Sequence, residues 1–148
     1  HTLMVYKNPK LTKLELPVLS GKLGSLDLID NDQLPYLEIP DLKELGGYLK
    51  LGNNAVMTSF AFPALTTVGN YLWFGFNPVL TSFSLPALTS VGAYLEVEKN
   101  EALAQCLADA LVAQVEAGLG VVGPIDTFGN NESCTCSEVD GVLVADCP

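Results

Sequence analysis

The chain repeats itself every 23 residues, and an asparagine marks each copy. This asparagine occurs five times, at Asn8, Asn31, Asn54, Asn77 and Asn100. A proline keeps the same step in the first four copies, at Pro17, Pro40, Pro63 and Pro86. No insertion or deletion separates the copies. A fixed period of about 20 to 29 residues with leucines at set offsets is typical of a solenoid in which each repeat forms one coil.

Apolar residues also hold fixed places in each copy. An L-x-L pattern before the asparagine puts two apolar side chains on one face of a strand, and a second such strand is ended by the proline. The six apolar columns begin at Leu3, Val5, Leu11, Leu14, Leu16 and Leu19. One coil cannot bury its own apolar stripe, so we expect the stacked columns to form the core. Each fully buried Leu or Phe side chain contributes about 1.5 to 3 kcal/mol.

The asparagine column predicts a ladder of hydrogen bonds. A side-chain amide can bond the backbone of its own turn and of the neighbouring coils, because it carries both donors and an acceptor. A leucine in its place would leave buried peptide groups unpaired, at about 1 to 3 kcal/mol each.

The repeat reads N-x-x-L-x-x-L-x-L-P-x-L-x-x-(L/V)-G-x-Y-L-x-L, and residues 77–95 carry it most clearly. This pattern, over residues 1 to about 105, resembles the receptor L-domain family. That family is a leucine-rich-repeat-like β-helix of insulin- and EGF-type receptor ectodomains, fungal GPI-anchored cell-wall proteins, and secreted or lipid-anchored bacterial proteins. The resemblance implies a mainly β, right-handed parallel β-solenoid that serves extracellular recognition or surface structure without catalysis.

The fifth copy departs from the repeat and predicts a cap. Cys106 stands where other copies have Leu or Phe, and Asp109 replaces the proline. Apolar residues at helical spacing predict a helix over about 101–117, with Asn100 as N-cap and Gly118 at its end. We therefore expect solenoid repeats over 1–105 and a cap over 106–148, with strand pieces at 120–122 and 141–145.

All four cysteines, Cys106, Cys134, Cys136 and Cys147, fall in this cap. Cys134 and Cys136 are too close in sequence to bond each other readily, so each is expected to pair with Cys106 or Cys147, and two connectivities stay open. A zinc site matches the spacing poorly, and we expect no metal or other cofactor. Disulfides predict an oxidising location, so we expect a secreted or cell-surface protein.

The charge and composition of the chain disfavour several classes of binding partner. Seven basic against seventeen acidic residues give a net charge of −10, which disfavours nucleic acid and anionic membranes. No apolar run approaches the length of a membrane span. The single histidine is His1, so a Ser-His-Asp or Cys-His arrangement within the body is ruled out and we expect no enzyme.

Aromatic residues are predicted on the outward side of the first strand of each coil. They are Tyr48, Tyr71, Trp73, Phe76 and Tyr94. Exposed Trp and Tyr on a rigid sheet are good anchors for a protein or a sugar ring. In the alternative interpretation the rings pack on one another and shield the sheet. The acidic groups at 27–32 and 96–101 match no calcium motif and read as solvated turns.

The first strand column begins without a capping element before it. We expect its edge to be covered by an upstream segment, to be a plain short end, or to take a partner strand. Repeated head-to-tail contacts of the last kind produce filaments. The sequence thus predicts a non-catalytic recognition or adhesion module and, as the alternative, a structural subunit that stacks head to tail into an extracellular filament.

Overall fold

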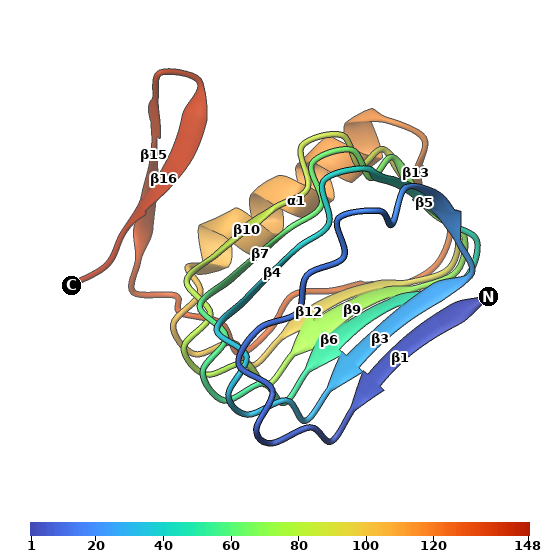
Figure 1. Cartoon of the computed structure of the whole chain (residues 1–148). Coiled ribbons are helices and arrows are strands. Elements are labelled where there is room, and N and C mark those ends of the chain that lie inside the picture. Colours follow the sequence, from blue (N-terminus) through green and yellow to red (C-terminus); the bar gives the residue numbers. More distant parts are fainter.

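The computed structural model describes residues 1–148 and forms a parallel β-solenoid whose coils stack along one axis (Figure 1). The predicted fold class is confirmed, because strands in successive coils pair in parallel with a 23-residue step, as in the series Leu26, Leu49 and Leu72. A helix and two disulfides lie near the C-terminus.

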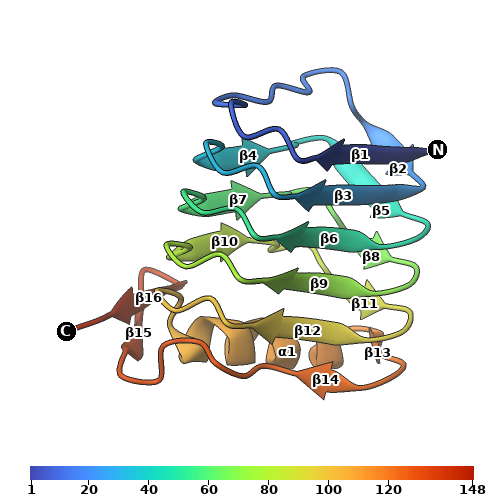
Figure 2. The ribbon, with the colours of Figure 1, turned by 90° about the horizontal axis from the view of Figure 1, so that it is seen from below.

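Three parallel sheets line the stack (Figure 2). Sheet A contains β1 (Thr2–Tyr6), β3 (Ser25–Ile29), β6 (Leu49–Gly52), β9 (Leu72–Gly75), β12 (Leu95–Glu98) and β14 (Ile125–Asp126). Sheet B contains β2 (Gly21–Leu23), β5 (Leu42–Leu45), β8 (Thr67–Val68), β11 (Ser90–Val91) and β13 (Gly120–Val121). Sheet C contains β4 (Tyr36–Glu38), β7 (Ser59–Ala61) and β10 (Ser82–Ser84).

The apolar columns form one continuous core inside these sheets. From the second coil on, inward residues such as Leu26, Leu51 and Phe74 are fully buried. In the first coil the same columns are only half-buried: Leu3, Val5, Leu11, Leu14, Leu16 and Leu19. A half-buried column recovers only part of the transfer free energy, so the first coil is held less strongly than the coils behind it.

The asparagines form the expected ladder. The backbone N–H of each one donates to the side-chain oxygen in the next coil, as from Asn31 to Asn54 at 3.0 Å and from Asn54 to Asn77 at 3.1 Å. The side-chain amide donates to a backbone carbonyl of the preceding coil, as from Asn54 to Leu28 at 3.2 Å. Asn31, Asn54, Asn77 and Asn100 are fully buried. The ladder therefore satisfies backbone groups that no water could reach.

The residue before each ladder asparagine has a left-handed backbone conformation. Its φ lies between 52° and 57° in the five regular coils, at Lys7, Asp30, Asn53, Phe76 and Lys99. Two of these, Asp30 and Asn53, are residue types that tolerate this conformation comparatively well. The repeated conformation turns the chain at the end of each strand in sheet A.

The helix α1 (Gln105–Ala117) begins four residues later than the sequence predicts. The prediction that Asn100 caps it is wrong, because the Asn100 side chain donates instead to Phe74 O and to Asn130 Oδ1 in the ladder. Ala104 stands at the N-cap without a side-chain hydrogen bond. Gly118 ends the helix, as expected. With 13 residues, α1 falls short of what a membrane crossing requires.

The solenoid pairing continues beyond the helix. β13 pairs with β11, and β14 pairs with β12, so sheets A and B each gain one more strand at this end. α1 takes the place of a further strand of sheet C, and the Gln114 amide donates to the carbonyls of Leu85 and Leu88, each at 2.8 Å. The C-terminal end of the core is therefore covered.

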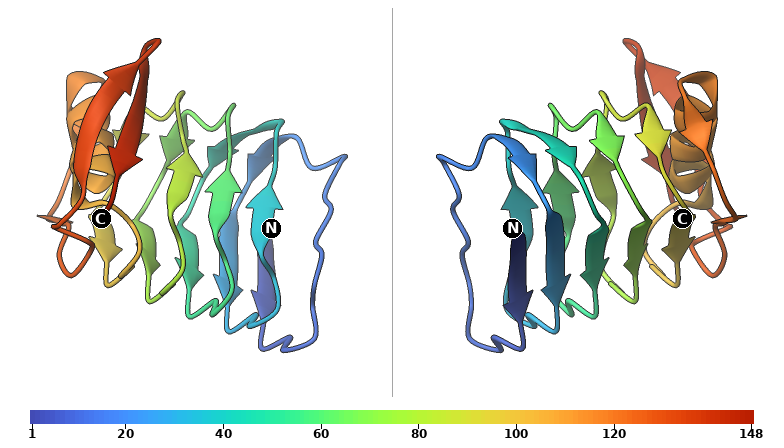
Figure 3. Two further views of the ribbon diagram at one scale, coloured as in Figure 1. Left: turned by 90° about the vertical axis from the view of Figure 1, so that its left-hand side faces the viewer. Right: turned by 90° about the vertical axis from the view of Figure 1, so that its right-hand side faces the viewer.

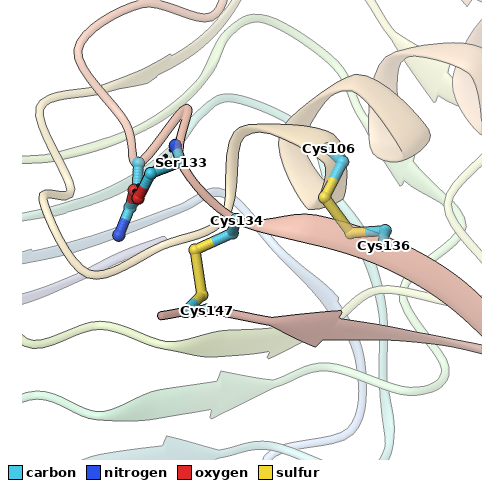
Figure 4. Close-up of a disulfide and its surroundings, with 6 residues drawn as sticks. Cys106, Ser133, Cys134, Cys136 and Cys147 are labelled. Atoms are coloured by element: carbon cyan, nitrogen blue, oxygen red, sulfur yellow. Dashed lines mark hydrogen bonds between the residues drawn. A yellow bond between two sulfur atoms is a disulfide. The ribbon is translucent and has the colours of Figure 1, made fainter.

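A β-hairpin of β15 (Thr135–Val139) and β16 (Val142–Asp146) projects from this covered end (Figures 1 and 3). Cys106 of α1 bonds Cys136 of β15, and Cys134 bonds Cys147 across the base of the hairpin (Figure 4). Of the two connectivities left open by the sequence, this is the one present. No backbone hydrogen bond joins residues 132–148 to the rest of the molecule, so the Cys106–Cys136 disulfide is the bond that ties the hairpin to α1.

The N-terminal end is different. Residues 7–20 contain no strand and form the outermost layer of the stack at this end (Figures 2 and 3). β1 and β4 are therefore edge strands of sheets A and C.

Candidate functional site

The outer face of sheet A brings together the aromatic residues that the sequence singled out. Tyr48, Tyr71 and Tyr94 stack face to face, with ring centroids 4.8 and 4.7 Å apart and planes within 3° of parallel. All three are half-buried. They thus match the alternative interpretation, in which the tyrosines pack on one another and cover the sheet.

Burial raises the pKa values of two tyrosines in the stack. Burial, followed by the neighbouring Tyr94, Tyr48 and Asp27, raises the pKa of Tyr71 to about 12. Burial and the nearby Glu96 carboxylate also raise the pKa of Tyr94. Tyr71 and Tyr94 therefore present neutral phenols to whatever approaches this face.

Trp73 lies over a floor of two glycines. A Cβ added at Gly52 would overlap the six-membered ring of Trp73, and one added at Gly75 would come within 3.2 Å of it. The indole N–H donates to Glu98 Oε1 at 3.0 Å, and Lys50 Nζ lies 5.4 Å from the ring centroid. The two glycines let the ring lie close to the sheet, and the hydrogen bond fixes its orientation.

Phe76 extends this aromatic surface toward the end of the strand. Its ring centroid lies 6.3 Å from that of Trp73, and 40% of the residue is exposed. Lys99 Nζ lies 4.7 Å from the Phe76 ring and 5.3 Å from the Phe128 ring. A bulky residue with φ near 57° is unusual and costs free energy, because its Cβ crowds the backbone. The same conformation occurs at this place in every coil, so the turn of the repeat imposes it on Phe76.

Carboxylates border the aromatic surface. Burial, followed by the charges of Glu98 and Asp126, raises the pKa of Glu96. Burial likewise raises the pKa of Asp27, partly offset by Lys50, and Asp27 Oδ1 is buried without a hydrogen-bond partner. No three His, Cys, Asp or Glu side chains are grouped as a metal ion would need.

A second surface lies beside the hairpin and was not predicted. A groove of about 450 Å³ runs between β16, α1 and the outer face of sheet C. Its apolar lining includes Phe83, Leu107, Val142 and Leu143. Ser82 and Ser84 line the groove on the side of sheet C. Sequence patterns placed a strand at 141–145 but could not place it in space, because a disulfide between distant residues decides its position.

The sequence analysis also missed the residues that end the ladder. Asn130 Oδ1 accepts the Asn100 backbone N–H at 3.3 Å, and the Asn130 amide donates to Val97 O at 2.8 Å and to Gln105 Oε1 at 3.1 Å. The signal was the spacing from Ile125 to Asn130, which equals that from Leu95 to Asn100. A seven-residue shift relative to the 23-residue period, caused by the helix, hid it.

Comparison with known proteins gives no family model, no curated protein and no solved structure that matches this chain.

Proposed function

We propose that this protein is a non-catalytic extracellular recognition or adhesion module that binds a protein or glycan through the outer face of sheet A. The observation that carries the proposal is the exposed Phe76 ring beside Trp73, which lies on its glycine floor. Rigid aromatic rings lose little entropy on binding and are the commonest anchors at interfaces.

Two further features support an extracellular role. All four cysteines are paired, and stable disulfides are characteristic of oxidising compartments. The 23-residue repeat resembles that of the receptor L-domain family, whose members present solenoid faces outside the cell. Both features point to a scaffold for contact rather than for catalysis.

A substitution at Phe76 can change ligand binding without lowering the stability of the fold. Asn53 occupies the same place in the preceding coil with φ near 53°, and asparagine tolerates this conformation better than phenylalanine. We expect Phe76→Asn to leave the melting temperature unchanged or higher while weakening ligand binding. The Phe76 ring is expected to contribute to ligand binding more than to folding. Substitutions that stabilise a binding site often reduce its function.

The experiment screens the wild-type protein against glycan arrays and cell-surface protein panels, then repeats every positive with variants. Trp73→Ala and Phe76→Asn should each lower affinity at least about tenfold, as removal of an aromatic anchor does. Tyr36→Ala is the matched control, because Tyr36 is an exposed aromatic residue on sheet C, away from this face. Equal binding by wild type and the Trp73 and Phe76 variants would contradict the proposal.

A second candidate function is that of a structural subunit that joins head to tail with other copies into an extracellular filament. The observation that favours it is the unlike character of the two ends: the first coil has an unpaired strand edge and half-buried leucines, whereas the other end is covered and bears the projecting hairpin. Unlike ends are what a heterologous contact requires.

A further inference from the structure

Charge is distributed unevenly along the solenoid axis. The first 23 residues carry four of the seven lysines, Lys7, Lys10, Lys13 and Lys22, against one acidic residue, Glu15. Two of these lysines form exposed ion pairs within the molecule, Lys13 with Glu15 at 2.8 Å and Lys22 with Glu44 at 3.3 Å. Residues 132–148, which include the hairpin, carry four acidic residues and no lysine or arginine: Glu132, Glu138, Asp140 and Asp146. The molecule therefore has a basic end and an acidic end, despite its net charge of −10.

Apolar surface is exposed at the same two places. In the first coil, Val18 is 90% exposed on a turn and Met4 is 63% exposed. In the hairpin, Val142 is 62% exposed and Val144 is 45% exposed. Isolated apolar residues on a surface need no explanation, but those of the hairpin lie beside an apolar groove.

We propose that the first coil of one copy docks into the groove beside the hairpin of a second copy. Val18 fills the apolar groove lined by Leu107 and Leu143, while Lys10 and Lys13 face Glu138 and Asp140 of the second copy. This inference rests on the second candidate function and is independent of ligand binding at sheet A.

The charges also decide the symmetry of the contact. Joining two first coils across a two-fold axis would bring two basic surfaces together, and joining two hairpins would bring two acidic surfaces together. Like charges facing each other in an interface are strongly unfavourable. The contact is therefore heterologous, and it produces an open chain of copies when the rotation between neighbours does not close a ring.

The test is a mass measurement by light scattering over a concentration series, at low and at high salt. We expect mass to grow continuously with concentration at low salt and to fall at high salt, because exposed charges are screened. The double variants Lys10→Glu/Lys13→Glu and Glu138→Lys/Asp140→Lys should each lower the association constant at least about tenfold. Val18→Asp should do the same without relying on lysine.

Mixing the two charge-reversed variants should restore growth. The reversed first coil of one variant then faces the reversed hairpin of the other, and the two unchanged surfaces face each other in the next contact. Lys43→Glu, an exposed reversal in the second coil, is the matched control and should assemble like wild type. Circular dichroism melting checks that every variant folds. A monomer at all concentrations, a closed dimer, or growth that the reversals do not alter would overturn the inference. Ligand binding measured on the monomeric Lys10→Glu/Lys13→Glu variant tests the sheet A face separately.

Discussion

The two ends of this solenoid differ in how completely their sheet edges and the asparagine ladder are paired. At the C-terminal end, β13 and β14 extend two sheets, α1 covers the third, and the ladder terminates at Gln105. At the N-terminal end, β1 has an unpaired edge, and the side-chain oxygen of Asn8 accepts no hydrogen bond within residues 1–148. At the covered end, the strands and side chains that extend the sheets and the ladder lie outside the 23-residue repeat. Covering this end of the solenoid therefore uses residues that leave the period.

The stability difference between the middle coils and the first coil should be largest for substitutions in the asparagine ladder. Asn54→Leu would leave the buried Asn31 N–H without its partner and would remove the amide hydrogen bonds to Leu28 O and Asn77 Oδ1. At about 1 to 3 kcal/mol for the unpaired N–H and about 0.5 to 1.5 kcal/mol for each lost hydrogen bond, we expect a loss of roughly 2 to 6 kcal/mol in the free energy of unfolding.

The matched variant is Asn8→Leu, which we expect to cost below about 1 kcal/mol because Asn8 is exposed. Guanidinium denaturation of both proteins measures the difference. Equal losses would show that the first coil is closed as tightly as the middle coils.

The next largest effect concerns how the closed end is fastened. Replacing Cys106 and Cys136 by serine opens a covalent loop of 30 residues that spans α1 and the last strands. The chain-entropy relation predicts a loss of about 3 to 4 kcal/mol. Replacing Cys134 and Cys147 opens a link of 13 residues within the hairpin alone, so the solenoid transition should move much less. Thermal unfolding that ranks the two pairs in the opposite order would mean that the hairpin belongs to the cooperative core.

A smaller effect is expected where α1 meets the last regular coil. Gln114→Leu removes the two hydrogen bonds to the carbonyls of Leu85 and Leu88, of which the Leu85 carbonyl still accepts the Leu88 backbone N–H. We expect a loss of about 1 to 3 kcal/mol from the two lost hydrogen bonds. Gln33→Leu, at an exposed turn, is the control and should change the unfolding midpoint little. If the two variants unfold alike, Gln114 does not contribute to the cap.

The smallest expected effect on stability comes from the repulsion between carboxylates at the C-terminal end of sheet A. Pairing of β14 with β12 places Asp126 beside Glu96, and burial with these acidic neighbours raises the pKa of Glu96 above its ordinary value of 4.5. A carboxyl whose pKa is raised on folding binds its proton more strongly in the folded state, so its contribution to stability falls as pH rises through that pKa.

Glu96→Gln should therefore raise the melting temperature modestly at pH 7, and the gain should shrink as the pH is lowered toward the ordinary glutamate range. Melting curves across this range measure it. A gain that grows on acidification would have the wrong sign for this mechanism.

The regular part of the molecule was predictable because its information is local and repeated. The spacing of Asn31, Asn54 and Asn77 fixes the coil length, and leucine columns two residues apart fix which face turns inward. What the sequence analysis got wrong lies where the period breaks. Asn100 was expected to cap the helix because a lone asparagine before an apolar run usually does so, yet the ladder uses its side chain first.

The candidate site was predictable only in part. The outward alternation placed Trp73 and Phe76 on one face, but their contacts depend on residues 21 to 25 positions away, such as Gly52 and Glu98. The position of the hairpin depends on the Cys106–Cys136 bond, one of two pairings that the spacing allowed. Contacts that occur once, between unlike residues of different coils, leave no period in the sequence.

The most direct test of the unlike ends is amide hydrogen exchange followed by mass spectrometry at low protein concentration. Peptides covering the middle coils and residues 95–131 should be strongly protected, whereas residues 7–20, which contain no strand, should exchange many times faster. Equal protection of residues 7–20 and the middle coils would contradict the account, because it would mean that the N-terminal end is as firmly closed as the C-terminal end.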